Sequence, residues 1–560
     1  MKTTITAIFL IAVTVLFMAQ NQSFAQAPDT VMVYANPPGV SNGLLINDFI
    51  NGDTTQTGQR NNPNRVYVLE QTGAVDTTYF LAAPIEANYH LTIIGKKNPI
   101  TGKLPLIECY TNPDNSTAPE FFIGDTLSNF TFKNLYFLST RTDGNQGPNV
   151  ILVTHAGGIS VNTDHCVYEN FGGNMFTNNA DHFKFIATNN EFRNITSVFW
   201  QGGSVLWSNG GAIIDTLIFQ NNTFFCVTRA AYGSPKYIGY LDFDHNTMFM
   251  GIGGTLLAQQ ITNARFTNNI FYGLMSHGAD SSYIKSGGAN AAHQGFGVIM
   301  VDTLSSLLNP PYSQTEAGRN IVVKNNAYCW PQAMYTYWKT VTDTGAAHHP
   351  GLITPPVWMN AQTQLMFNDK TKWPGLSEAN NDSVDPGFAA SLVSAAVDSN
   401  LKFTNLIWTG QAVGAFRWSQ FPQDPFNYTY PVTENLKYTN ATLLTAGTDG
   451  KPLGDLNWFP ELMGVTQVSN NVPSNFSLSQ NYPNPFNPTT VINYTVPKSS
   501  FVSLKVYNIL GQEVATLYQG FQKAGSYKAD FDASRLSSGV YLYRLMSNGF
   551  TMTKKMILMK

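Results

Sequence analysis

A short phrase centred on Asn-Asn or His-Asn returns five times in this chain. Each copy places apolar residues two positions apart on both sides of the polar pair, which is the spacing of side chains along one face of a β-strand. The second residues of the pairs are 32, 24, 23 and 57 residues apart, and the shorter steps are typical of solenoid repeats. The copies are FIATNNEF at 185–192, FQNNTF at 219–224, FDHNTMF at 243–249, FTNNIF at 266–271 and VVKNNAYC at 322–329.

The polar pair itself predicts a turn between two strands. Asparagine tolerates the left-handed backbone conformation that tight turns require, and its amide group both donates and accepts hydrogen bonds. When coils stack, such amides can hydrogen-bond from one coil to the next as a ladder. We therefore expect a ladder made by the second members of the pairs, Asn190, Asn222, Asn246, Asn269 and Asn326.

Earlier copies of the phrase are less regular. The segment 130–137 has one asparagine, Asn134, and the segment 159–168 is expected to place Asp164-His165 where later coils have the Asn pair. Before them, residues 66–96 alternate as strands without a pair, as a first coil or cap would.

This pattern resembles the right-handed parallel β-helix family, which includes pectate lyases and related polysaccharide enzymes. The resemblance rests on the period and the ladder over about residues 60–330. It implies an all-β fold in which residues 26–330 form the helix with its N-terminal cap. Charged residues make up 12% of the chain, against a usual share of about 25%, which suits stacked strands with neutral polar faces.

The sequence also predicts that the protein is secreted and excludes nucleic acid as a partner. Met1-Lys2, an apolar run from Ile8 to Met18 and a small-x-Ala site ending at Ala25 predict a secretory signal peptide over residues 1–25. The apolar run is shorter than the roughly 20 residues of a membrane span, so we expect no transmembrane segment in the mature chain. The net charge of −3 and the lack of a basic run exclude a nucleic-acid partner.

Four cysteines are few for an exported chain of this length. They have no CxxC spacing, so neither a disulfide framework nor a zinc site is expected. We expect buried thiols at Cys109, Cys166, Cys226 and Cys329.

From residue 476 the chain changes character. Alternating strands over about 490–496, 501–508, 526–532, 539–546 and 550–558, separated by turn residues, predict a small Ig-like β-sandwich. Four phrases carry a closer resemblance: NYPNPFNPTT at 481–490, VYNILGQEV at 506–514, SSGVYLYRL at 537–545 and the terminal KKMILMK.

Together these phrases resemble the type A C-terminal sorting domain of the type IX secretion system of Bacteroidota and their relatives. The resemblance implies transport across an outer membrane, removal of the domain by a sortase-like protease, and release or attachment to surface lipopolysaccharide. It also implies that the secretion machinery recognises a set of residues in the last two strands: Gly539, Val540, Tyr541, Lys554 and Lys555.

Residues 331–464, between the helix and the tail, are expected to form a C-terminal cap and connecting segment, followed by a linker over 465–475. The stretch 445–461 contains Asp449-Gly450 and Gly454-Asp455, which could belong to a calcium or phosphate loop. Neither the EF-hand nor the P-loop spacing is met, so two tight turns in a capping segment are the preferred interpretation.

Registering the coils on the Asn pairs predicts a substrate site. Seven residues after position zero of each coil, counting from His165 in the first, stand Gly172, Ser197, Arg229, Gly253 and Ser276. Aromatic faces can cover sugar rings, and an arginine can pair with a carboxylate through two bonds. The predicted substrate-binding residues around this stack are Trp200, Gln201, Tyr232 and Lys236.

Resemblance to β-helix lyases implies removal of a proton α to a uronate carboxylate by Lys or Arg, with Ca²⁺ or another cation neutralising the acid. The predicted catalytic residues are Arg229, His277 and Lys285. The carboxylates that could hold Ca²⁺ are scattered, so no metal ligands are assigned; they are Asp164, Asp181, Asp242 and Asp244. The structural alternative is that Arg229 is a surface residue and His277 a turn residue.

Polygalacturonases, which are also parallel β-helices, carry motifs that partly match this chain. Asn162-Thr163-Asp164, Ser276-His277-Gly278 and Ile284-Lys285 follow the same order as their motifs, but the paired Asp between them is missing. Glycoside hydrolysis needs two carboxyl groups, so a hydrolase is less favoured than a lyase. The leading hypothesis is an exported protein that engages polysaccharide and acts as a lyase on acidic glycan. The alternative is a non-catalytic adhesin or structural surface protein, with the β-helix as a stiff scaffold.

Overall fold

The computed structural model describes residues 29–34, 45–54, 61–62, 64–70, 78–87, 89–125, 128–141, 147, 150–195, 203–208, 213–228, 231–233, 237–253, 260–276, 278, 297–304, 315–340, 355–408, 430–459, 465–469, 473–498, 500–522, 524–534, 536–547 and 550–560. The predicted signal peptide, residues 1–25, lies outside these residues. Within them, none of the helices has the length and the apolar character needed to cross a membrane.

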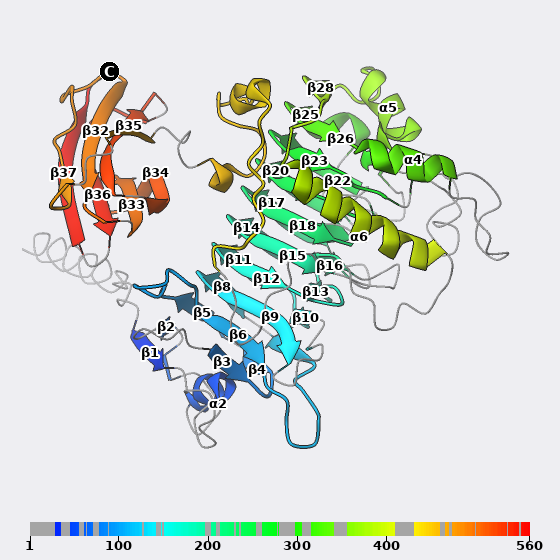
Figure 1. Cartoon of the computed structure of the whole chain (residues 1–560), viewed down its shortest axis with the longest axis horizontal. Helices are drawn as coiled ribbons and strands as arrows, with labels where there is room; N and C mark the ends of the chain where they lie inside the picture. The colour runs from blue at the N-terminus through cyan, green and yellow to red at the C-terminus, as the bar shows by residue number, and fades with distance from the viewer. Residues whose placement is uncertain are drawn as a thin grey trace, which may run out of the picture.

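Most of the described strands belong to three parallel sheets around one apolar core, so the chain forms a parallel β-helix (Figure 1). Each coil adds a strand to an eleven-stranded sheet, then one to a ten-stranded sheet and, in the N-terminal coils, one to a six-stranded sheet. In spatial order the eleven-stranded sheet consists of β1 (Thr30–Tyr34), β2 (Val66–Glu70), β5 (Leu91–Gly95), β8 (Asn129–Lys133), β11 (Ser160–Asp164), β14 (Phe183–Thr188), β17 (Ile214–Gln220), β20 (Tyr237–Asp244), β22 (Gln260–Thr267), β25 (Asn320–Lys324) and β28 (Leu376–Ala379).

The other two long sheets complete the coils. The ten-stranded sheet consists of β3 (Thr78–Leu81), β6 (Leu106–Cys109), β9 (Tyr136–Arg141), β12 (Val167–Glu169), β15 (Glu191–Ile195), β18 (Thr223–Val227), β21 (Thr247–Phe249), β23 (Ile270–Tyr272), β26 (Ala327–Cys329) and β29 (Asp382–Ser383). The six-stranded sheet consists of β4 (Ile85–Ala87), β7 (Glu120–Gly124), β10 (Val150–Thr154), β13 (Phe176–Asn178), β16 (Leu206–Ser208) and β19 (Tyr232–Gly233). Farther along, β24 (Gly297–Ile299) pairs with β27 (Val357–Met359).

The asparagine pairs form the turn between the eleven-stranded and the ten-stranded sheets. The first residue of a pair is left-handed, with φ of 57° at Asn221 and 51° at His245. The second residue donates its Nδ2 to Oδ1 of the next one, over 3.1, 3.0, 3.2, 2.9 and 2.8 Å along Asn190, Asn222, Asn246, Asn269, Asn326 and Asn381. The predicted ladder is confirmed. It also continues to Asn381, because β28 and β29 extend the coils past residue 330, the boundary expected from the sequence.

One predicted register is wrong by one residue. Asp164 pairs with Thr188, so His165 takes the first, left-handed position of the turn with φ of 54°. The ladder position of this coil is Cys166, whose backbone N–H donates to Asn190 Oδ1 over 2.9 Å. Asp164 ends its strand with its side chain on the outer face, where it forms an ion pair with Lys133 at 2.7 Å.

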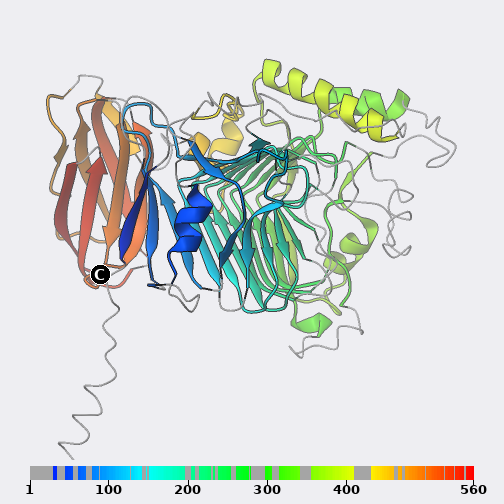
Figure 2. The same ribbon diagram turned by 90° about the horizontal axis from the view of Figure 1, so that it is seen from below.

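Helices cover the ends and one side of the coils. At the N-terminal end, α2 (Ile46–Gly52) buries Ile46 and Ile50 in the core beside β3 and β4. At the C-terminal end, α5 (Ala361–Asn368) packs on β28, which gives part of the expected region 331–464 a capping role. Two more helices, α4 (Gln332–Thr340) and α6 (Ala390–Trp408), contact each other and lie outside the coils (Figure 2).

The rest of the expected connecting segment lies along the side of the coils. Residues 430–459, yellow in Figure 1, pack on the outer face of the ten-stranded sheet. Three short 3-10 helices are described: η1 (Glu316–Gly318), η2 (Ala441–Thr445) and η3 (Leu456–Trp458). Cys109, Cys166 and Cys226 are buried free thiols, as predicted, whereas Cys329 is half-buried.

The C-terminal region is a β-sandwich with its own apolar core. One antiparallel sheet consists of β31 (Ser477–Leu478), β32 (Thr489–Val496), β35 (Gly525–Asp532) and β30 (Val465–Ser469), and the other of β34 (Glu513–Gln522), β33 (Ser500–Tyr507), β36 (Gly539–Ser547) and β37 (Phe550–Leu558). The predicted all-β fold, a parallel β-helix followed by a small sandwich, is confirmed. Strand β30 comes from the segment 465–475, which the sequence suggested as a linker, and it forms the edge of the first sheet beside β35.

Candidate functional site

The residues predicted to bind or convert substrate fall mostly outside the described part of the chain. For Tyr232 the structure describes the backbone in β19, which pairs with the buried Leu206 of β16. The six predicted residues that lie outside the described residues are Trp200, Gln201, Arg229, Lys236, His277 and Lys285.

Four of these residues lie within six residues of two neighbouring strands in the sequence. Trp200 and Gln201 precede β16 in the sequence, Arg229 precedes β19, and Lys236 follows it. Strands β16 and β19 are parallel neighbours at one edge of the six-stranded sheet. The outer face of this sheet is therefore the described surface on which a site can be built.

An aromatic side chain stands on that face. Trp207 lies between the buried residues Leu206 and Ser208 in β16, so its half-buried ring points outward. Its neighbours along the stack, through direct pairing of β16, β13, β10 and β7, are Thr177, Val153 and Ile123. These side chains are half-buried too and form one row, the outer row of the six-stranded sheet.

The outer row has a rigid support on the inner side of the sheet. Thr154 Oγ1 donates to Asn178 Oδ1 over 2.8 Å, and Asn178 Nδ2 donates to Ser208 Oγ over 3.0 Å. All three residues are buried, so these bonds link β10, β13 and β16 in an environment where breaking them is costly. The Trp207 ring therefore stands on a sheet whose strands are joined by buried hydrogen bonds on the inner side.

The predicted stack of residues seven positions after position zero of each coil is not exposed along its whole length. Ser276 is buried, and its hydroxyl group lies 2.7 Å from Thr404 Oγ1 of α6. Its carbonyl accepts from Trp338 Nε1 of α4 over 2.7 Å. Helices α4 and α6 therefore cover this coil, and the predicted substrate site does not continue across Ser276.

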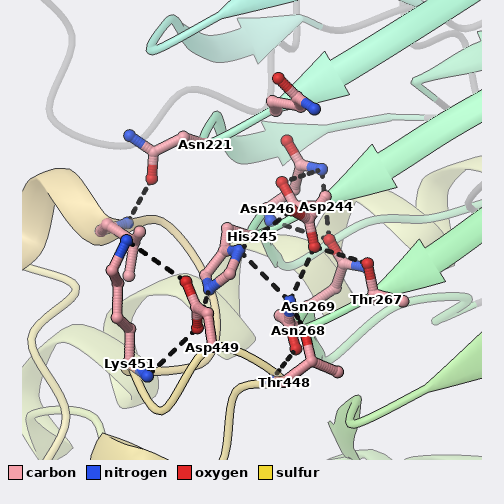
Figure 3. Close-up of polar contacts among 12 residues, drawn as sticks. Asn221, Asp244, His245, Asn246, Thr267, Asn268, Asn269, Thr448, Asp449 and Lys451 are labelled. Carbon is pink, nitrogen blue, oxygen red and sulfur yellow. Dashed lines mark hydrogen bonds and ion pairs between the residues drawn. The ribbon is translucent and has the colours of Figure 1, made fainter. Parts of the chain in front are cut away.

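A polar corner runs along the turn made by the Asn pairs. Residues 446–458, here called the strap, cross four successive coils there and bind the first residue of each pair. Figure 3 shows the turns at Asn221, His245 and Asn268. Asn325 donates to the Ala446 carbonyl, Asn268 accepts from the Thr448 N–H over 2.8 Å, and Asn221 accepts from the Leu456 N–H. The strap thus uses the outward side chains of the turn, while the second asparagines bind to each other inside.

His245 is the charged contact between the coils and the strap. Its Nδ1 lies 3.3 Å from Asp244, and its Nε2 lies 3.5 Å from Asp449 of the strap, as Figure 3 shows. Burial alone would lower the pKa of His245, but hydrogen bonds and the charges of these two carboxylates outweigh it and raise the pKa to about 9. His245 is therefore a cation at neutral pH. The same contacts hold the pKa of Asp449 low despite its burial.

The strap should loosen when pH rises above neutrality. Because the pKa of His245 is raised from 6.5 to about 9, its contribution is fully present below pH 6.5 and is lost as pH rises through about 9. We expect amide exchange in 446–452, corrected for the intrinsic rate, to rise about tenfold or more between pH 6.5 and 9.5. Mass spectrometry of exchanged peptides measures this change.

The matched variant for this prediction is His245→Asn. Asparagine already occupies the same left-handed position in neighbouring coils, so the backbone should be preserved. The variant should show a smaller change with pH than the wild type. Asp455, whose pKa is raised to about 7 by burial, is present in both proteins and lies outside the peptide 446–452. Equal pH dependence in both proteins would show that His245 does not hold the strap.

A buried ion network fixes the segment before the strap. Arg193 binds Glu434 through Nε at 2.7 Å and Nη2 at 2.8 Å, and it binds Glu169 through Nη1 at 2.6 Å. Asn194 Nδ2 donates to Glu169 over 3.0 Å, and the Tyr136 hydroxyl donates to the same carboxylate. Glu434 is 241 residues from Arg193, so no sequence pattern predicted this contact.

The carboxylates considered for Ca²⁺ are used elsewhere. Asp242 and Asp244 face outward from β20 and both bind Arg265, at 3.2 and 3.7 Å, while Asp181 accepts a backbone N–H from Ile213 over 2.7 Å. Across the described ranges, no group of three or more His, Cys, Asp or Glu side chains is placed to hold a metal ion. Ca²⁺ stays a prediction tied to the lyase hypothesis.

The predicted sorting residues lie at one end of the second sheet of the sandwich. Gly539, Val540 and Tyr541 of β36 pair with Leu558, Ile557 and Met556 of β37, and Lys555 and Lys554 pair with the next two residues. Tyr541 is buried, and its hydroxyl donates to the Ser537 carbonyl over 2.7 Å, so its side chain supports the sandwich. Val540 is exposed.

Comparison with known families identifies the sandwich. Residues 480–559 match the family described as "Secretion system C-terminal sorting domain". No curated protein is similar enough in sequence to match the chain. The match covers the sandwich from just after β31 to the last residue but one and leaves the β-helix to be interpreted from its geometry.

Proposed function

This protein carries a type IX sorting domain and is exported to the cell surface or the medium, and we propose that its β-helix binds polysaccharide there, along the outer row of the six-stranded sheet. The observation that carries the proposal is the outward ring of Trp207 on a rigidly supported row. An aromatic face of this kind offers apolar contact to the faces of sugar rings, and its edge leaves room for hydrogen bonds.

The shape of the outer row fits a polymer better than a small ligand. Successive coils place Ile123, Val153, Thr177 and Trp207 about 4.8 Å apart, so the surface repeats along the helix axis. None of the four side chains is charged. A chain of sugars can therefore lie along the row and contact several coils at once.

A lyase reaction is the catalytic form of this proposal. Trp200, Gln201, Tyr232 and Lys236 would bind an acidic glycan, and Arg229, His277 and Lys285 would supply the base and the cationic groups for proton removal α to the uronate carboxylate. Support comes from five of these residues: Tyr232 belongs to β19, and Trp200, Gln201, Arg229 and Lys236 lie within six residues of β16 or β19 in the sequence, at the edge of the sheet that carries Trp207. Ca²⁺, if bound, would neutralise the substrate carboxylate.

A non-catalytic adhesin is the second candidate, and the uncharged outer row favours it. Stacked strands with an apolar and hydroxyl surface suit adhesion to a neutral glycan without any acid or base. The two candidates share the Trp207 surface and differ in the charge of the glycan and in whether it is converted.

One binding experiment tests the shared part of the proposal. Trp207→Ala should lower glycan-array signal at least tenfold without changing the melting temperature, because it removes the aromatic face from a row held by its own backbone pairing. Tyr240→Ala, an exposed aromatic residue on the eleven-stranded sheet, is the control and should bind like wild type. Equal binding by both variants would contradict the proposed surface.

An activity screen separates the two candidates. Uronate polymers are incubated with the protein, with and without Ca²⁺, and unsaturated product is followed by ultraviolet absorbance. Turnover that Arg229→Ala and His277→Ala abolish supports the lyase. Glycan binding with no product from any polymer supports the adhesin.

A further inference from the structure

The sorting domain exposes large apolar side chains that its fold does not require. Ile509 is 74% exposed, Leu510 78%, Val540 39% and Met559 56%. These four residues are here called the apolar tip. Folded domains rarely expose apolar side chains as a group unless the surface binds a partner.

Strand pairing brings the apolar tip together at one end of a sheet. The pairing of β33 with β36 ends at Tyr507 and Leu542. Val540 lies two residues before Leu542 on β36, just past this end of the pairing. Ile509 and Leu510 follow Tyr507 at the same end. Val540 pairs with Ile557 on its other side, and Met559 follows β37 there.

The turn that carries Ile509 and Leu510 is well fixed. Asn508 N–H donates to the Gln512 carbonyl over 2.9 Å, and Gly511 N–H donates to the Asn508 carbonyl over 3.0 Å. The Asn508 side chain also accepts from the N–H groups of Leu510 and Gln512, each over 3.0 Å. Two apolar side chains are thus presented to solvent on a closed turn, a geometry that lowers the entropy lost when a partner binds.

The charges around the apolar tip are mainly positive. Lys555 is exposed and pairs with Leu542, and Arg544 lies over the Tyr507 ring at 5.2 Å. Lys505 is neutralised by Glu513 at 2.9 Å. Lys560 follows Met559 directly and donates through its Nζ to the Ser534 carbonyl. A partner that fits this surface presents an apolar pocket with carboxylates at its rim.

We propose that the apolar tip is the surface through which the sorting domain docks on a protein of the type IX secretion machinery, in an apolar pocket rimmed by carboxylates. The partner follows from the family match of residues 480–559 to a secretion-system sorting domain. The geometry assigns Ile509 and Leu510 to the recognition surface, alongside Val540. It assigns Tyr541 to the interior instead. The inference is independent of any glycan-binding role of the β-helix.

The test is export of the full chain from the organism that encodes it. Ile509→Ser with Leu510→Ser should reduce the protein at the cell surface and in the medium at least tenfold, with the protein accumulating in the periplasm. Lys555→Glu should reduce export in the same direction, because it reverses the charge of the rim. Both purified variants should keep the wild-type melting temperature, because none of the three side chains is part of the core.

A matched control uses an equally exposed residue of the same type. Ile100 is 69% exposed on a turn of the β-helix that is closed by Asn98, as the Ile509 turn is by Asn508. Ile100→Ser should be exported like wild type. Normal export of the Ile509 and Leu510 variant overturns the proposal, and so does an equal loss with Ile100→Ser. A wild-type dimer in sedimentation that the tip variant dissociates also overturns it, because a second copy would then occupy the surface.

Discussion

Replacing Arg193 by methionine is expected to destabilise the β-helix by about 3–5 kcal/mol. The substitution keeps most of the side-chain volume but leaves Glu169 and Glu434 buried without their cation. Breaking one partner of a buried ion pair costs far more than the pair contributes, because the remaining charge stays in a poorly solvated place. Urea denaturation followed by tryptophan fluorescence measures the change in the free energy of unfolding.

Two further variants make this prediction specific. Arg265→Met removes an arginine that also binds two aspartates but is 48% exposed, and it should cost less than Arg193→Met, because Asp242 keeps a hydrogen bond from Gln220 Nε2. Adding Glu434→Gln to Arg193→Met removes one of the two buried carboxylate charges left without a cation and should recover part of the lost stability. If Arg193→Met and Arg265→Met cost the same, the network does not stabilise the fold as an ion pair.

Asn222→Ala is expected to cost about 3–5 kcal/mol, because it breaks the ladder in its middle. The Asn222 amide donates to the Ala187 carbonyl over 2.9 Å and to Asn246 Oδ1 over 3.0 Å. It also accepts from the backbone N–H and the Nδ2 of Asn190 over 2.9 and 3.1 Å. Alanine leaves these buried donors and acceptors without partners, and each such group costs about 1–3 kcal/mol.

The control for Asn222 is the last asparagine of the ladder. Asn381 accepts from Asn326 and donates to the Val323 carbonyl over 2.9 Å, but it is half-buried, so water can replace the lost bonds. Asn381→Ala should therefore cost only about 1–2 kcal/mol. Denaturation of both variants under the same conditions gives the two losses of unfolding free energy. Equal losses would show that the buried bonds of the ladder stabilise the fold no more than the half-buried bonds at its end.

Much of the fold was predictable because its features are local in the sequence. The alternation of apolar residues around each Asn pair reports a strand, a turn and a strand within about eight residues, and the phrases of the tail report the sorting domain. The last coil was missed for a local reason as well. Asn380-Asn381 is followed by Asp382-Ser383 and preceded by Ser377-Glu378-Ala379, so the end of the stack lacks the apolar pattern of its neighbours.

The error at Asp164 has a physical cause that the sequence hides. A polar residue that ends a strand and a polar residue that begins a turn look alike, and only strand pairing distinguishes them. Once Asp164 is opposite Thr188, His165 takes the left-handed position and Cys166 the ladder position. A thiol cannot form the two-way bonds of an amide, so at Cys166 the ladder bond that remains is the one from the backbone N–H to Asn190 Oδ1.

The candidate site was less accessible from the sequence, because it depends on contacts between distant residues. Burial of Ser276 depends on Thr404 and Trp338, and the role of His245 depends on Asp449. No periodicity connects these pairs. Trp207, in contrast, had a signal: Leu206-Trp207-Ser208 repeats the alternation of Phe176-Thr177-Asn178 thirty residues earlier.

The strap also fixes the number of coils that lie between its two ends. Repeat proteins commonly change length by duplicating or deleting a coil, because each coil contacts only its neighbours. Here the strap binds the turns at Asn221, His245, Asn268 and Asn325 in order, so it spans a fixed number of repeats. If a coil were inserted between these four, its turn would have no contact with the strap, and the strap residues beyond it would no longer lie opposite their partners. The strap therefore fixes the length of this part of the β-helix.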